Sequence, residues 1–556
     1  MNNLNFLVDV LKESPVFKTL EKNVKPGRTV CASGLSTINK SNIIYALCRL
    51  KGVTAFCLAS DEKEAQTLCN DLSCMGLRAY VYPVRDFNFL DFQSRSHEYE
   101  HARLKVLLKL INHECDVAIA CVDAAAQLTV PRNVLEQSVI EFEEGRELSL
   151  EKATKALTLL GYERFDAVEG SGQFSLRGGI LDFFMPDSDY PVRCEFWGDE
   201  ITDLSYFDIE TQRRFKKADK ITLSPSTEIV IEDRAALADK IEHKAKLLRS
   251  KNSAKAKEKL FSEAELIRSG AMIANADKFI NQIYDKPESL FDYLDRNTLV
   301  FASEFTAIQE RGKSMDFISN ETLMQGFEDG TLCRGFDRFA LTFNECTEFL
   351  QSHGTIVLEN FVHGSMPIKL SEIMSFSTKQ LSAWGGSYKQ LKEDVDGLFT
   401  PESKGVIFAG TERAAKNLCD TFNADGINAV YSEGADKISK GELLVMQGAL
   451  SAGFEYPSQK FFAITYSQVS YRPEKSKKKK KKTGQEIYSL SELAPGDYVV
   501  HNVHGIGVFG GIRKIDTHGV IKDYIKIDYA KGDVLYVPVT PVSYTHLRAH
   551  ETCADL

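Results

Sequence analysis

The sequence predicts a multidomain α/β protein with a parallel sheet, an inserted β-hairpin module, a further α/β unit and a small C-terminal β-barrel. Apolar strands alternate with helical segments between residues 28 and 131, two runs of alternating apolar residues follow near residues 173–198, and short strands separated by glycines fill residues 493–539. A chain of 556 residues that is 43% hydrophobic and 26% charged is long enough for several cores.

The first predicted domain is a layer of βαβ units. Its strands TVCAS, VTAFCLA, AYVYP and DVAIACV are continuous apolar runs, which is typical of a parallel sheet covered on both faces. A Rossmann-like or helicase-like layer fits this pattern. A further buried strand, LVFASE, begins at Leu299, so the domain is predicted to be discontinuous, with parts at 1–126 and 216–335. The charged stretch 233–268 within the second part is predicted to be helical.

The predicted module at 127–215 contains the most unusual residues of the chain. Two runs, 173–184 and 192–198, flank a turn rich in Pro, Asp and Ser, which predicts a β-hairpin. Alternation places Val192, Cys194 and Phe196 on one face of the second strand, and it places Arg193, Glu195 and Trp197 on the other. An indole beside a guanidinium resembles an interface hot spot. The alternative is that Trp197 covers a neighbouring helix and that the arginines are solvated.

The remaining predicted parts are a third α/β domain, a linker and the barrel. Strands GVIFAG, NAVYSE, LLVMQGA and FFAITY define the domain at 336–467 with its lead-in. A basic linker follows at 468–490, because RPEKSKKKKKK holds eight basic residues and one acid, and like charges repel. The net charge of -10 argues against nucleic-acid binding by the chain as a whole. Residues 491–541 form the predicted barrel.

The module sequence resembles a known family. The strings RGGILDFF, PVRCEFWGDEI and FDIETQR are similar to the UvrA-binding module that UvrB shares with bacterial transcription-repair coupling factors. The resemblance implies that Arg177, Arg193 and Trp197 contact UvrA. Coupling factors usually have phenylalanine at the last position, so Trp197 keeps the apolar anchor but changes its size.

The barrel sequence carries a second resemblance. PGDYVVHNVHGIGVFGGI and DYIKIDYAKGDVLYVPV are similar to the RNA-polymerase interaction domain of coupling factors, which also occurs in CarD-like regulators. This implies an SH3/Tudor-like barrel with one strand edge that pairs with the β subunit of RNA polymerase. We place that edge at 511–516, with Ile512, Lys514 and Ile515 as contacts. A plain core position for Ile515 remains open.

One segment near the N-terminus approaches a phosphate-binding loop. Residues 34–41 read GLSTINKS, so Gly34, Lys40 and Ser41 match the motif and Asn39 replaces its second glycine. No acidic pair ends an apolar strand, and DVAIACVDAA offers only Asp123. The loop is therefore predicted to be a degenerate nucleotide site. Coupling factors resemble UvrB in this domain without its ATPase motifs, so the resemblance implies a degenerate UvrB/helicase-like layer. No catalytic residue and no cofactor is assigned to this chain.

Metal and membrane functions are not predicted. HEYEH at 97–101 fits a zinc-protease pattern, but no third ligand follows, so His97 and His101 are interpreted as surface or capping residues. The twelve cysteines form no CxxC pair and are interpreted as reduced core residues. No apolar run approaches the length of a membrane span and no signal sequence is evident, which predicts a cytoplasmic protein without a membrane partner.

Together the resemblances imply the N-terminal portion of a coupling factor, truncated before its motor. Residues 542–556, which include VSYTHLRAHET, match a reading frame of a transposase sequencing adapter and are expected to be a non-native tail. The expected function is transcription-coupled excision repair, in which stalled RNA polymerase is linked to UvrA. ATP, Mg and most contacts to double-stranded DNA are expected to belong to the motor. The alternative is a UvrB-like or helicase-like nucleotide-dependent repair enzyme.

Overall fold

The computed structural model forms two compact units, Met1–Val469 and Ser470–Leu556. The description that follows covers these residues: 4–85, 97–137, 140–248, 253–270, 276–362, 366–381, 388–466, 498–501, 505–517, 520–529, 534–538 and 547–549. Within this part of the chain, no helix is long and apolar enough to cross a membrane.

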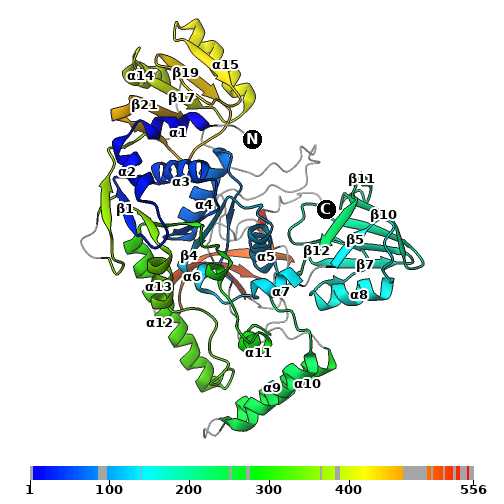
Figure 1. Ribbon diagram of the computed structural model, residues 1–556. Helices are drawn as coiled ribbons and strands as arrows, with labels where there is room; N and C mark the ends of the chain where they lie inside the picture. The colour runs from blue at the N-terminus through cyan, green and yellow to red at the C-terminus, as the bar shows by residue number, and fades with distance from the viewer. Residues whose placement is uncertain are drawn as a thin grey trace. The chain divides into compact units, whose positions relative to one another are not determined.

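A seven-stranded parallel sheet forms the centre of the first unit (Figure 1). Its strands, in spatial order, are β15 (Glu372–Ser375), β1 (Val30–Ser33), β14 (Thr355–Leu358), β13 (Leu299–Ser303), β2 (Ala55–Ala59), β4 (Val117–Cys121) and β3 (Ala79–Val81). Strand β13 pairs with β2 although the module lies between them in sequence, which is the arrangement expected of a discontinuous domain. The sheet also continues past the boundary predicted at residue 335, since β14 and β15 flank β1.

Both faces of this sheet are buried, as continuous apolar strands require. Alternate residues of one strand enter different cores: Phe56 and Leu58 face one core, whereas Ala55 and Cys57 face the other. The helices that cover the two faces are α1 (Asn5–Lys12), α2 (Pro15–Asn23), α3 (Thr37–Lys51) and α4 (Glu62–Cys74) in one core, and α5 (Glu98–Ile111), α6 (Val122–Ala126), α7 (Arg132–Gln137), α12 (Phe305–Asp329) and α13 (Phe343–His353) in the other. Ten of the eleven described cysteines are buried and none is in a disulfide.

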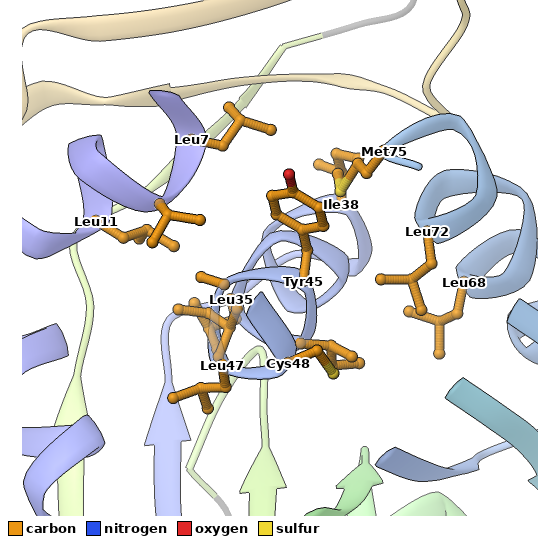
Figure 2. Close-up of a cluster of buried hydrophobic side chains, with 14 of the residues drawn as sticks. Leu7, Leu11, Leu35, Ile38, Tyr45, Leu47, Cys48, Leu68, Leu72 and Met75 are labelled. Carbon is orange, nitrogen blue, oxygen red and sulfur yellow. The ribbon is translucent and has the colours of Figure 1, made fainter. Parts of the chain in front are cut away.

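The third α/β domain has its own six-stranded sheet. The spatial order is β16 (Lys379–Leu381), β20 (Gly453–Tyr456), β21 (Phe461–Thr465), β17 (Lys404–Phe408), β19 (Glu442–Met446) and β18 (Ala429–Ser432). The helices α14 (Tyr388–Leu398) and α15 (Glu412–Ala424) cover one face. The other face shares a core with α1 and α3, part of which Figure 2 shows around Tyr45 and Leu11. The third domain therefore packs against the first domain through apolar side chains.

A buried carboxylate, Asp71 on α4, links these two domains. It accepts hydrogen bonds from the Ser451 amide (2.7 Å) and hydroxyl (2.7 Å) of the third domain, and from the Ser41 hydroxyl of α3 (3.3 Å). No cation is among its described partners. Burial therefore dominates and raises the pKa of Asp71 to about 6, while the three hydrogen bonds partly oppose this rise.

This raised pKa predicts a pH dependence of stability. The folded state holds the Asp71 proton more tightly than the unfolded chain, whose carboxyl has a pKa near 3.8. The contribution of Asp71 to stability is therefore fully present below pH 3.8 and is lost as the pH rises through about 6, by on the order of 3 kcal/mol. Unfolding of Asp71→Asn, measured between acidic and neutral pH, should lack this decrease. An unchanged pH profile in the variant would contradict the assignment.

The inserted module is a six-stranded sheet rather than a single hairpin (Figure 1). Its strands, in spatial order, are β11 (Arg214–Lys217), β10 (Glu200–Phe207), β9 (Val192–Trp197), β8 (Ile180–Phe183), β7 (Gln173–Arg177) and β6 (Glu163–Arg164). The predicted first run, 173–184, is two strands, because the chain reverses at Gly178 and Gly179, and Gly178 has a φ of 63°. Helix α8 (Leu150–Leu159) shares a core with one face of this sheet and with the pair β5 (Ile140–Glu143) and β12 (Lys220–Leu223).

The charged stretch 233–268 is helical, as the sequence predicts, and forms a pair of packed helices, α9 (Arg234–Leu247) and α10 (Ser253–Ser269). The short helix α11 (Ile280–Ile283) follows them. The predicted linker at 468–490 lies outside the described residues.

The C-terminal unit is an antiparallel sheet of five strands. The spatial order is β25 (Val534–Pro538), β24 (Val520–Asp528), β23 (Gly505–Thr517), β22 (Tyr498–His501) and β26 (Leu547–Ala549). The described strands do not close into a barrel, because β25 and β26 are the two outer strands of this order. Strand β26, which pairs with β22, lies within the segment 542–556 that was expected to be a non-native tail.

Candidate protein-docking faces

The outer face of the module sheet carries the residues that the sequence singled out. Along β9, Val192, Cys194 and Phe196 are buried in the module core. Arg193 and Glu195 are only partly covered, and Trp197 is 81% exposed. The predicted alternation of this strand is therefore confirmed, and Trp197 is too exposed to cover a helix in the described part of the chain.

Two tight turns bring Arg177 and Trp197 to the same end of the sheet. Arg177 directly precedes the turn between β7 and β8, and Trp197 directly precedes the turn between β9 and β10, where Gly198 has a φ of 64°. The turn between β7 and β8 approaches β9 closely: a Cβ at Gly179 would lie 2.7 Å from the Phe196 carbonyl oxygen. Glycine is therefore required at position 179 for this approach.

A buried carboxylate, Asp182 on β8, joins the two arginines. Arg193 donates from Nε to Oδ1 (2.7 Å) and from Nη2 to Oδ2 (2.8 Å), and Arg177 donates from Nη2 to Oδ2 (2.8 Å). Arg193 also donates to the Gln212 carbonyl oxygen (3.1 Å) and lies over the Phe207 ring, 4.5 Å from its centroid. The Asp182 hydrogen bonds outweigh burial and raise the pKa of Arg193.

Exposure separates the three residues that were assigned to UvrA binding. The side chain of Arg177 is 51% exposed, whereas that of Arg193 is only 13% exposed and that of Asp182 is 1% exposed. Arg177 and Trp197 can therefore meet a partner directly. Arg193 has most of its donors already engaged within the module.

The strand assigned to polymerase binding is β23, which lies inside the C-terminal sheet. Its first part pairs with β22 over Gly505–Val508, so β23 is not an outer strand over its whole length. In its second part, Ile512, Lys514 and Ile515 pair with Ile525, Asp523 and Lys522 of β24 on one side. Among the described strands, none pairs with the opposite side of 511–517, so a free edge remains there.

The phosphate-like loop is closed by bonds within the protein. Gly34 and Leu35 donate their amides to the carbonyl oxygens of Asn360 (3.1 Å) and Glu359 (3.0 Å). The ammonium of Lys40 is buried and bonds to Glu304 (2.6 Å), Ser303 (2.9 Å) and Glu64 (3.3 Å).

The other residues of the motif also make hydrogen bonds within the protein. Asn39 lies inside helix α3, where its Oδ1 accepts from the Ser36 hydroxyl (2.7 Å), and Ser41 bonds to Asp71. Asn39 therefore occupies a helical position and not a left-handed one.

The surroundings of Lys40 are acidic. Burial raises the pKa of Glu359, and the neighbouring Glu304 raises it further, whereas the charge of Lys40 helps to lower the pKa of Glu64 against the effect of burial. Three carboxyl groups thus surround one ammonium group, which is unfavourable for a bound phosphate.

The HEYEH segment is part of the boundary between the first domain and the module. His97 is exposed and lies 3.0 Å from Glu100, but His101 is partly buried and faces Gly172, where a Cβ would lie 2.7 Å from the imidazole. Gly172 of the module therefore covers part of His101, which leaves this side chain less exposed than that of His97. Glu98 is exposed. Among the described residues, no group of His, Cys, Asp and Glu side chains is placed to hold a metal ion.

A buried ion pair that the sequence analysis missed fixes the base of the module. Arg103 of α5 bonds from Nε to Glu228 (2.6 Å), which lies where the chain leaves the module, and from Nη1 to Gln127 (2.8 Å), which lies where the chain enters it. Thr129 also donates to Glu228 (2.7 Å), and Arg103 and Glu228 are both fully buried. The sequence feature that could have indicated this pair is the arginine within the apolar run ARLKVLLKL, because a buried arginine is normally paired.

Comparison with known families matches two segments of the chain. The UvrB interaction domain matches residues 140–229, and the CarD-like/TRCF RID domain matches residues 493–548. The two matches define a multidomain protein with one module of each kind.

Curated relatives extend the similarity over most of the chain. The transcription-repair-coupling factor of Bacillus subtilis (strain 168) is 28% identical over 548 residues, which cover 96% of this chain and 46% of that protein. The factor of Staphylococcus haemolyticus (strain JCSC1435) is 26% identical and covers 83% and 40%, respectively. The chain is a homologue of the N-terminal half of transcription-repair-coupling factors, and it spans less than half the length of these relatives.

Proposed function

We propose that this chain acts as the adaptor portion of a transcription-repair coupling factor. In this proposal the module binds UvrA and the C-terminal sheet binds the β subunit of RNA polymerase, so that a polymerase stalled at DNA damage is linked to excision repair. The observation that carries the proposal is the pair Arg177 and Trp197, which lie exposed at one end of a matched UvrB interaction domain. An exposed tryptophan and an exposed arginine on one face are typical of a binding hot spot.

The proposed polymerase contact is strand addition at the free side of β23. Main-chain hydrogen bonds from 511–517 to a strand of the β subunit would supply affinity, and alternate side chains would fix the register. Ile512, Lys514 and Ile515 remain the proposed contacts within this strand. The match to the CarD-like/TRCF RID domain supports this assignment.

Release of the polymerase by an ATP-dependent DNA translocase is proposed for the full-length protein. ATP, Mg and most contacts to double-stranded DNA belong, in this proposal, to a motor outside residues 1–556. The competing proposal, a nucleotide-dependent repair enzyme built on the first domain, is disfavoured because the buried Lys40 is already paired with two partly buried carboxylates.

The closed loop predicts that this chain does not bind ATP at Lys40. Millimolar Mg-ATP should leave its thermal unfolding midpoint unchanged, since only a ligand that binds the folded state stabilises it. A fluorescent ATP analogue should likewise show no saturable binding. Saturable binding that is lost in Lys40→Met would contradict the closed loop and favour the competing proposal.

The adaptor function is tested by capture of purified UvrA on the immobilised chain. The unmodified chain should retain UvrA, and Arg177→Ala should retain clearly less. A variant at an exposed lysine of the same module, Lys155→Ala on α8, should behave like the unmodified chain, because its side chain lies away from the two turns and is 74% exposed. Failure of the unmodified chain to capture UvrA would overturn the proposal.

A further inference from the structure

We infer that Asp182 is a positioning residue of the UvrA-docking face, and that Arg193 acts through Asp182 and Arg177 rather than by touching the partner. This inference rests on the proposed function. In the register of the sheet, Asp182 is the cross-strand neighbour of Arg193 on β9 and of Ser175 on β7. Arg177 lies two residues after Ser175 on β7, so its side chain is on the same face of the sheet.

The geometry assigns different tasks to the two arginines. Arg193 is bound at both ends of its guanidinium by Asp182, lies on the Phe207 ring and is also held by Gln212, whose side-chain oxygen lies 3.3 Å from Nη2. Such a bidentate, stacked arginine has little freedom to turn toward another molecule. Arg177 makes one described hydrogen bond, to Asp182, and is half exposed, so most of its donors face outward.

The charges lead to the same assignment. Two guanidinium groups share one buried carboxylate, so the cluster carries one net positive charge, and Arg177 is its exposed end. Arg193 reinforces the position of Asp182, and Asp182 holds the Arg177 side chain on the face that also carries Trp197. Ordering of a long side chain before binding removes part of the entropy cost of association.

The arrangement also defines the chemistry of the partner surface. A carboxylate group would pair with the free edge of Arg177, and an apolar socket would receive the Trp197 indole. Ile180, the cross-strand neighbour of Arg177 on the same face, would lie between them. The docking site on UvrA should therefore combine an acidic side chain with an apolar depression.

The test is a double-mutant cycle on UvrA affinity. Asp182→Asn keeps the shape of the side chain and removes its charge, so it should weaken binding by about 3- to 10-fold, the cost of ordering one long side chain. In an Arg177→Ala background the same change should have less than about a 2-fold effect, because the residue that Asp182 positions is gone. Arg193→Lys should follow the same pattern, since it keeps the charge and loses the bidentate bond.

The outcomes separate the inference from the function on which it rests. Equal losses in both backgrounds would show that Asp182 only supports the sheet, or that Arg193 touches UvrA itself, and would overturn the inference. Unchanged affinity in Asp182→Asn would also overturn it. If Asp182→Asn fails to fold, Gln212→Ala loosens Arg193 from outside the buried cluster and should show the same dependence on Arg177. No binding by the unmodified chain would overturn the proposed function together with this inference.

Discussion

Replacement of Arg103 by methionine is expected to lower the free energy of unfolding by about 3 kcal/mol, because the buried Glu228 loses the closer of its two arginine partners and keeps only Arg85, 3.8 Å away. Methionine fills much of the space of the arginine stem, so the loss measures the missing charge more than a cavity. Thr129 and Gln127, which bond to the same pair, would lose their geometry as well.

The free energy of unfolding is measured by chemical denaturation, and two variants serve as controls. Lys155→Met removes an exposed ion pair with Glu151 on α8 and should leave the free energy of unfolding nearly unchanged. The double variant Arg103→Met with Glu228→Leu should be more stable than Arg103→Met alone, because no unpaired charge remains. A loss below about 1 kcal/mol in the single variant would contradict the role of the buried pair.

Replacement of Trp197 by alanine is expected to weaken UvrA binding by about 2 kcal/mol or more, a loss of roughly 30-fold in affinity. The indole is 81% exposed, so its removal should leave the stability of the module unchanged. Binding is measured by titration of UvrA, and folding is measured by thermal unfolding of the same samples.

Phe361→Ala supplies the matched control for Trp197. Phe361 belongs to the first domain and is 72% exposed, so the two changes remove aromatic rings of similar exposure. Phe361→Ala should leave the affinity for UvrA unchanged. Equal losses from both variants would indicate non-specific apolar binding rather than a defined site.

Local patterns in the sequence predicted much of the architecture. Continuous apolar runs such as VAIAC correspond to parallel strands buried on both faces, and alternation in VRCEFW assigned each side chain of β9 to the correct face. These features depend on residues close in sequence, so they can be read without knowledge of the fold.

Long-range partners could not be predicted in the same way. Arg193 was assigned as a contact, but its neighbours Asp182 and Gln212 come from other strands and turns and leave it little exposed. The pairing of Lys40 with Glu304 joins residues more than 260 positions apart. Strands β14 and β15 fall within 336–467, the range predicted for the third domain with its lead-in, because nothing local distinguishes a strand of one parallel sheet from a strand of another.

The central claim is that one chain links a repair protein to a polymerase, and formation of a ternary complex tests it most directly. This chain, UvrA and the β subunit of RNA polymerase are mixed, and the mass of the complex is measured after size-exclusion chromatography. We expect a complex that contains all three proteins, and we expect Trp197→Ala to remove UvrA while the β subunit stays bound. Mutually exclusive binding of the two partners, or loss of both in Trp197→Ala, would contradict the account.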